Sequence, residues 1–197
     1  MTSTLLKALA LLLVGSAAAA QAPSLKLAPE YQMRIEGTSN LRDWGADIKQ
    51  MEVELVLRDS TAYAPADLRP EHFKKMTLRI PVEGISSGTR GLTGKIHKYL
   101  KKKKHPFITF TLDHVTSVEH QGDAALITAQ GVINAAGKDQ VVTLRVTAIT
   151  DESGRLCIAG TQPLAMTGFD IKPPTAVFGT IKAKDEFAVR FNLSFNR

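Results

Sequence analysis

The chain has 197 residues, 44% of them hydrophobic, and a formal net charge of +6 at pH 7. This length suits one domain with a sizeable core, and a single cysteine, Cys157, excludes a disulfide within the chain. The positive excess is modest and much of it is one run, Lys101–Lys104, without interleaved aromatic residues. These features argue against nucleic-acid binding.

The first 22 residues have the three parts of a secretory signal peptide. Lys7 supplies the positive charge, Leu9–Val14 an apolar run that is too short to span a membrane, and Ser16–Ala22 a tail of mostly small residues. We expect cleavage after Ala20 or Ala22, with a retained membrane anchor as the alternative. Residues 23–197 are then expected to form a single domain in the periplasm or outside the cell.

From residue 31 onward, apolar and polar residues alternate in segments that are typical of strands with one apolar face. The chain before this point, residues 22–29, is interpreted as a lead-in. Eight strands are expected, at residues 31–36, 51–58, 76–82, 107–118, 124–133, 141–149, 155–160 and 187–196.

One stretch departs from this alternation and predicts a short helix. Leu92, Ile96, Tyr99 and Leu100 recur at helical spacing, and Pro106 prevents the helix from continuing. We expect this helix to cap, plug or gate whatever the strands enclose. Two irregular segments are expected besides: residues 59–70, with a helical turn at 70–74, and residues 164–181, with one helical turn after Pro173-Pro174.

The order of these elements predicts the fold class. No alternation of strands with helices appears, so a parallel sheet is not expected. Sequential antiparallel strands with one apolar face either form two sheets or close into a barrel. The order of the elements therefore predicts an all-β fold and leaves these two arrangements open, and closure of eight strands into a barrel would leave room for one small ligand.

Signals for catalysis are weak. Gly84–Gly88 matches G-x-S-x-G around Ser86, but a nucleophile elbow needs an α/β sheet. Residues 88–95 fail the phosphate-loop pattern, and the five histidines show no zinc spacing. No catalytic residue, metal ligand or cofactor is therefore predicted, and a hydrolase that uses Ser86 is kept as an alternative.

Three stretches resemble the YceI-like family of exported, lipocalin-like lipid-binding proteins. They are GTSNLRDW at 37–44, HPFITFTL at 105–112 following the helix, and MTGFDIKPPTAVFGTIKAKDEFAVRFNLSF at 166–195. Residues 131–144 fit the family more loosely, and GLTGKIHKYLKKKK replaces a more acidic stretch in the family's commonest pattern.

The resemblance implies an all-β, eight-stranded antiparallel lipocalin-like barrel with one short helix and a long irregular loop. This barrel would hold a long isoprenoid-type lipid in an apolar tunnel without catalysis. A polyisoprenoid or an isoprenoid quinone is the implied ligand, and the implied roles include transport, sequestration and stress response. The expected ligand-binding residues are the apolar ones on the strands, the helix and the closing segment: Trp44, Met51, Val53, Leu55, Met76, Leu78, Ile80, Leu92, Ile96, Tyr99, Ile108, Phe110, Leu112, Met166, Phe169, Phe178, Phe187, Val189 and Phe191.

Other partners are less determined by the sequence. Lys101–Lys104 could meet a membrane surface transiently or simply be solvated, and a homodimer is a further alternative. An envelope protein that binds the lysine run would make the chain an interaction module instead of a carrier.

Overall fold

The computed structural model describes residues 24–58, 63–176 and 178–196. The expected signal peptide and its cleavage site lie outside these ranges, so they stay predictions.

Eight antiparallel strands close into a barrel, as predicted. Their order around the barrel is β1-β4-β5-β7-β8-β9-β10-β12, and β12 pairs with β1 to complete the circuit. The strands are β1 (Ser24–Leu27), β4 (Glu52–Leu57), β5 (Phe73–Pro81), β7 (Phe107–Gln121), β8 (Ala124–Ala135), β9 (Lys138–Thr150), β10 (Leu156–Ala165) and β12 (Ile181–Asn196).

The longest of these strands, β12, has a different neighbour at each of its ends. Its last residues pair with β1, whereas its first part pairs with β2 (Gln32–Ser39), with a register shift between Ala183 and Phe187. The hairpin partner of β2 is β3 (Asp43–Ile48), which pairs in turn with β6 (Ile85–Ser86). Two-residue β11 (Thr175–Ala176) pairs with the start of β12.

Four of these strands, β1, β3, β6 and β11, were not expected from the sequence. The lead-in prediction for residues 22–29 was wrong because Leu25 and Leu27 alternate over only four residues, too few to show a period. In β3 the segment DWGADI contains two aspartates and a glycine, residues that are depleted in strands. Tertiary pairing overrides that weak preference.

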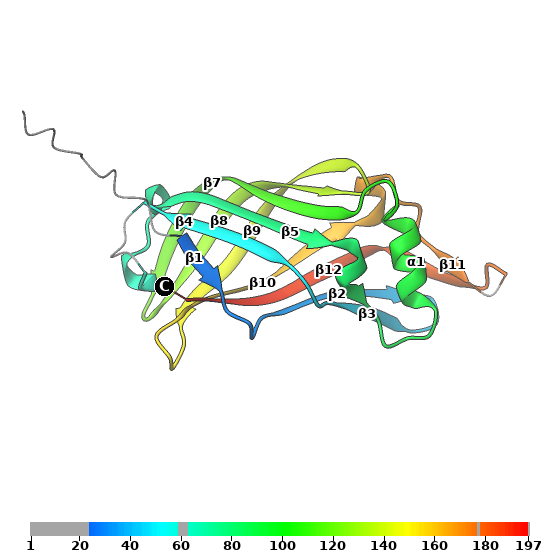
Figure 1. The fold of residues 1–197 in the computed structure, drawn as a ribbon, viewed down its shortest axis with the longest axis horizontal. Helices are drawn as coiled ribbons and strands as arrows, with labels where there is room; N and C mark the ends of the chain where they lie inside the picture. Colours follow the sequence, from blue (N-terminus) through cyan, green and yellow to red (C-terminus); the bar gives the residue numbers. More distant parts are fainter. Residues whose placement is uncertain (1–23, 59–62, 177, 197) are drawn as a thin grey trace, which may run out of the picture.

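The two ends of the barrel are covered differently (Figure 1). The helix α1 (Leu92–Tyr99) lies at the same end as β11, while β1 and the C-terminus lie towards the opposite end. Within the described residues there are also four 3-10 turns: η1 (Pro65–Asp67), η2 (Pro70–His72), η3 (Val82–Gly84) and η4 (Met166–Phe169). The predicted helix and the turn at Pro70 are confirmed.

The helical turn expected after Pro173-Pro174 was placed wrongly, since η4 comes before the prolines. Its position follows from Asp185 on β12, whose carboxylate accepts hydrogen bonds from the backbone N–H of Thr167 at 2.9 Å and from its hydroxyl at 2.6 Å. Asp170, with a φ of 53°, ends the turn in the left-handed region. A side chain distant in sequence therefore fixes this turn.

The end of the barrel away from α1 is filled with side chains. Leu25, Leu55, Leu57, Leu68 and Phe195 are each at most 1% exposed. Leu68 comes from the segment that carries η1 and η2, so this segment covers the packed end.

Candidate functional site: an apolar cavity beneath the helix

Two adjacent cavities lie within the barrel, the outer one beneath α1 and the inner one behind it. The inner cavity has a volume of about 180 Å³ and the outer one about 240 Å³. Ile35, Leu100, Ile171 and Phe187 line both, so these four side chains form the boundary between them. A ligand longer than either cavity would have to pass this boundary.

The inner cavity is enclosed by the barrel wall. Its lining comes from the inward faces of β2, β3, β5, β7, β8, β9, β10 and β12, with Leu100, Phe169 and Ile171 closing one side. Thr109 and Gln162 are the polar residues of this lining, and the Gln162 amide donates a hydrogen bond to the carbonyl of Pro163 at 3.0 Å. Such a surface binds by removing apolar area from water and offers no charge to a ligand.

Small residues give the large ones room within the barrel. A Cβ on Gly131 of β8 would clash with the ring of Phe110 on the neighbouring β7. Ala129, two residues earlier on the same face, lines the inner cavity, whereas Ala125 is fully buried in the packed core. Of these small residues, Ala129 borders the inner cavity directly, and Gly131 leaves room for the ring of Phe110.

The outer cavity lies between α1, the β2–β3 turn and the β11–β12 hairpin. Leu92, Ile96 and Tyr99 contribute the apolar side of α1 to its lining, and Trp44 and Met166 face it from β3 and η4. Trp44 lies against Gly37, its cross-strand neighbour, and its indole N–H donates to the carbonyl of Thr38 at 3.1 Å. The ring is thus fixed in the cavity wall.

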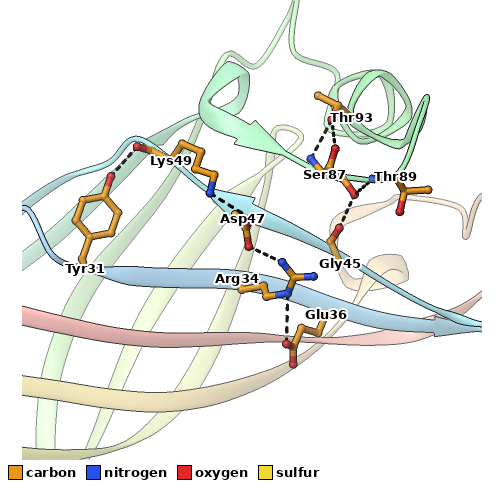
Figure 2. A network of polar contacts seen from close by, with 9 residues as sticks. All are labelled: Tyr31, Arg34, Glu36, Gly45, Asp47, Lys49, Ser87, Thr89 and Thr93. Carbon is orange, nitrogen blue, oxygen red and sulfur yellow. Dashed lines mark hydrogen bonds and ion pairs between the residues drawn. The ribbon is translucent and has the colours of Figure 1, made fainter.

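Polar contacts tie α1 to the barrel (Figure 2). The Ser87 hydroxyl donates to the carbonyl of Gly45 on β3 at 2.6 Å, and the Ser87 N–H donates to the hydroxyl of Thr93 on α1 at 2.9 Å. A ring nitrogen of His97 lies 2.9 Å from the carbonyl of Ile85. Thr93 and His97 lie in the first and last turns of α1, so these bonds tie both turns of the helix to the segment around β6.

The C-terminal end of α1 closes in a Schellman-like arrangement. Lys101 adopts a φ of 55°, and the N–H of Lys102 donates to the carbonyl of His97 at 2.9 Å. The lysine run begins here. Lys101 donates to the carbonyl of Ala136 at 3.3 Å, and Lys102 lies 3.9 Å from the Glu83 carboxylate.

Three cationic side chains line the outer cavity: Arg42, Arg90 and Lys95. All three are exposed, and no ion pair within the described residues joins them to a carboxylate. The lining contains no acidic residue. The outer cavity therefore reaches the surface through a positively charged rim.

Charges on the other face of β2 and β3 are paired and point away from the cavity. Met33 and Ile35 face inward, so Arg34 and Glu36 face outward. Arg34 bonds the carboxylate of Asp47, which Lys49 also approaches at 3.2 Å, as Figure 2 shows. The hydrogen bond from Arg34 holds the pKa of Asp47 below its usual value, with a smaller contribution from Lys49.

Most residues expected to bind a ligand lie on one of the cavities. The inner lining includes Met76, Leu78, Ile80, Ile108, Phe110, Leu112, Phe169, Phe187, Val189 and Phe191; the outer lining includes Trp44, Leu92, Ile96, Tyr99 and Met166. Four lie on neither. Leu55 is fully buried in the packed end, Met51 and Val53 pack against the core, and Phe178 is fully exposed. Ligand contact by any of these residues stays a prediction.

Other lining residues were absent from the sequence prediction. Much of the β8–β10 wall is among them, as are the boundary residues Ile35, Leu100 and Ile171 and the cations of the rim. Leu144 and Val146 could have been found from the alternation of β9. Ile171 could not, because it lies in an irregular segment without a period.

The proposed nucleophile Ser86 lies in β6, where it pairs with Asp47 of β3 in an antiparallel sheet. No hydrogen bond within the described residues joins its side chain to a histidine. Among those residues no group of three or more His, Cys, Asp or Glu could hold a metal ion, and no helix is long and apolar enough to cross a membrane.

A closed antiparallel barrel with a capped apolar interior is the architecture of β-barrel proteins that hold one small ligand. Comparison with protein families identifies the family: residues 32–195 match the YceI-like domain, and the chain belongs to this family. The resemblance seen in the sequence is thereby confirmed.

Solved structures show the same fold at low identity. A polyisoprenoid-binding domain from Saccharophagus degradans, implicated in plant cell wall breakdown, has a TM-score of 0.62 and 12% identity, over 89% of this chain and 98% of its own. BcnA of Burkholderia cenocepacia has a TM-score of 0.61 and 15% identity, over 83% and 95%. The YCEI protein of Campylobacter jejuni has 0.56 and 15%, over 77% and 84%. No curated protein matched in sequence.

Proposed function

We propose that this protein binds a long isoprenoid-type lipid in its two cavities and carries or sequesters it, without a chemical step, after export to the periplasm. The observation that carries the proposal is the apolar lining of two adjacent cavities, the outer of which ends in a charged rim beneath a tethered helix. Membership of the YceI-like family supports it, as does the structural likeness to a domain described as polyisoprenoid-binding.

The chemistry of the two cavities gives the ligand a direction. The inner lining is almost wholly apolar and would hold the end of the hydrocarbon chain. The outer cavity combines the apolar side of α1 with Arg42, Arg90 and Lys95, so the polar head would lie there. Burial of hydrocarbon contributes about 25 cal/mol per Å² to binding.

The shape of the space favours a chain over a compact ligand. Each cavity is smaller than the roughly 300–1,000 Å³ of common small-molecule sites, but the two meet at four side chains. A slender flexible chain fits such a two-part space better than a rigid ring system does.

Native mass spectrometry and solvent extraction of protein purified from its own host test the proposal. We expect a co-purifying isoprenoid lipid that is released on unfolding. A protein that carries no lipid and that takes up no added polyprenol would contradict it. Export is tested separately, by fractionating cells that produce the full chain or a chain without residues 1–22.

No structural observation favours Ser86 hydrolysis, and it is not proposed. A contact of Lys101–Lys104 with a membrane surface remains a prediction, and the position of the run beside the outer cavity is compatible with it.

A further inference from the structure

Two exposed apolar side chains lie on neighbouring tips at the α1 end. Leu41, in the β2–β3 turn, is 66% exposed, and Phe178, between β11 and β12, is fully exposed. Asn40 ties the two tips together: its amide donates to the carbonyl of Thr180 at 2.9 Å, and its side-chain oxygen accepts from the N–H of Lys182 at 2.7 Å. We call Leu41 and Phe178 the tip residues.

Both tip residues are held outward by local structure. The Ser39 hydroxyl accepts from the N–H groups of Leu41 and Arg42 and donates to the Arg42 carbonyl, which fixes the β2–β3 turn. Phe178 has a φ of 55°, in the left-handed region that is unfavourable for a bulky residue. An asparagine or glycine would suit this position better, so the turn itself does not require an aromatic residue.

Basic side chains gather at the same end. Arg42, Arg90 and Lys95 line the outer cavity, Lys98 and Lys101–Lys104 lie in and directly after α1, and Lys182 pairs with Thr175 of β11. Asp43 at the start of β3 and Glu83, which Lys102 approaches at 3.9 Å, are acidic residues of the neighbouring segments. Figure 1 shows the segments of this group, α1, β11 and the β2–β3 turn, gathered at one end.

The outer cavity opens between the same elements. Ser39 and Arg42 belong to the β2–β3 turn, and Thr175 and Ile181 to the β11–β12 hairpin that carries Phe178. A flat surface that touched both tips would thus meet the rim of the cavity. From the outside inward, this end of the molecule therefore presents the exposed tip residues, then basic side chains, and then the apolar cavity.

We propose that this end docks on an anionic lipid bilayer, with Leu41 and Phe178 inserted among the lipid head groups and the surrounding lysines and arginines on anionic phosphates. Exposed apolar residues flanked by basic ones are the pattern of interfacial membrane binding. The docking does not require the cavity to hold a lipid. Transfer between bilayer and cavity would follow from it, and that consequence alone rests on the proposed function.

Sedimentation with vesicles of phosphatidylcholine, with and without phosphatidylglycerol, tests the docking on delipidated protein. The wild type should bind the anionic vesicles, and less tightly as salt rises. The variant with Leu41→Ser and Phe178→Asn should bind at least about tenfold more weakly, which corresponds to about 1.4 kcal/mol. Asparagine tolerates the left-handed backbone at residue 178, so the fold should persist.

Ile149→Ser provides the matched control, because Ile149 is 45% exposed on β9 near the opposite end of the barrel. It should leave vesicle binding unchanged. Equal loss in the control and in the tip variant would overturn the proposal. The proposal would also be overturned if the tip variant still bound vesicles and lost this binding only when Lys103 and Lys104 were replaced by glutamate. The lysine run alone would then be the contact.

An insertion-sensitive fluorophore gives a second readout. Placed at Phe178→Cys, it should shift to the blue on adding anionic vesicles, and at Ile149→Cys it should not; Cys157 is buried and should not compete for the label. A blue shift that appears with rising protein concentration alone would overturn the proposal in favour of a second copy on the tips. Lipid uptake from detergent, measured in parallel, tests the cavity independently of docking.

Discussion

Phe187 lies at the boundary of the two cavities and is the residue whose size should decide what length of chain can bind. It belongs to the linings of both, on β12 just past the register shift of that strand. A smaller side chain at this position would leave more room between the two cavities, and a larger one would leave less.

We expect Phe187→Trp to weaken binding of a long polyprenol by tenfold or more while sparing a short one. The physical reason is that the inner cavity becomes inaccessible, so that the buried apolar area decreases. Titration of chains of increasing length by tryptophan quenching or native mass spectrometry would show it. Phe187→Leu is the control and should keep or improve long-chain binding; equal loss for short and long chains would contradict the boundary role.

Gly131 is a residue whose importance comes from its neighbour. A Cβ there would clash with Phe110 and with the carbonyl of Thr111. Gly131→Ala should therefore destabilise the protein by about 1–3 kcal/mol, the usual cost of overpacking. Urea denaturation measures this, and Gly94→Ala, where the added Cβ meets nothing within 4 Å, serves as a comparison.

At the scale of the element, α1 is held to the barrel by hydrogen bonds, but its own sequence has low helix propensity. Gly94 lies within the helix, and no side chain caps the N-terminus at Gly91. Gly94→Ala should stabilise the protein by up to about 1 kcal/mol through helix propensity. Gly91→Ala should destabilise it, because Gly91 has a φ of 75°.

If α1 gates the cavity, the same Gly94→Ala change should also slow ligand exchange. Hydrogen exchange of the α1 amides and the dissociation rate of a bound polyprenol should then decrease together. A slower dissociation without greater amide protection would argue against gating by the helix.

The turn η4 depends on the Asp185 carboxylate. Hydrogen bonds from the hydroxyl of Thr167 and then from its N–H hold the pKa of Asp185 below its usual value. A lowered folded-state pKa stabilises the fold above the unfolded-state value of about 3.9, and this stabilisation is lost as the pH falls through the folded-state pKa.

Asp185→Asn should therefore lower the free energy of unfolding at pH 7, and the difference from wild type should narrow below about pH 4. Urea titrations at pH 7 and pH 3 measure the two differences. Asp123→Asn, in the exposed turn between β7 and β8, is the control for a lost surface charge. A difference that is constant with pH would mean that the carboxylate's charge is not what holds η4.

For the whole molecule, alternation along the chain predicted antiparallel strands with one apolar face. The resemblance to the YceI-like family then decided between two packed sheets and a closed barrel. Alternation could not show where that interior is filled. Leu55 and Met76 are directly paired across β4 and β5, yet Leu55 lies in the packed core and Met76 lines the inner cavity. Alternation shows which side of the sheet a residue faces. It does not show which side chains from segments without a period, such as those that carry Leu68 and Ile171, pack into the interior.

The sequence pattern also failed to predict β1, the strand on which closure of the barrel depends. β1 pairs with β4 on one side and with the end of β12 on the other, and it inserts Leu25, 1% exposed, into the packed end. A four-residue strand has little pairing energy of its own, so its position should depend on this one buried side chain.

Leu25→Ala should therefore lower the free energy of unfolding by about 2–5 kcal/mol, the range for deleting a buried leucine side chain. It should also increase exchange of the Lys26 amide and of the β4 amides that face β1, because the barrel opens at its shortest strand. Urea denaturation and hydrogen exchange measure the two effects. Lys26→Ala, exposed on the same strand, should stay within about 0.5 kcal/mol of the wild type. An equal effect of both substitutions would mean that backbone pairing, not the buried leucine, keeps the barrel closed.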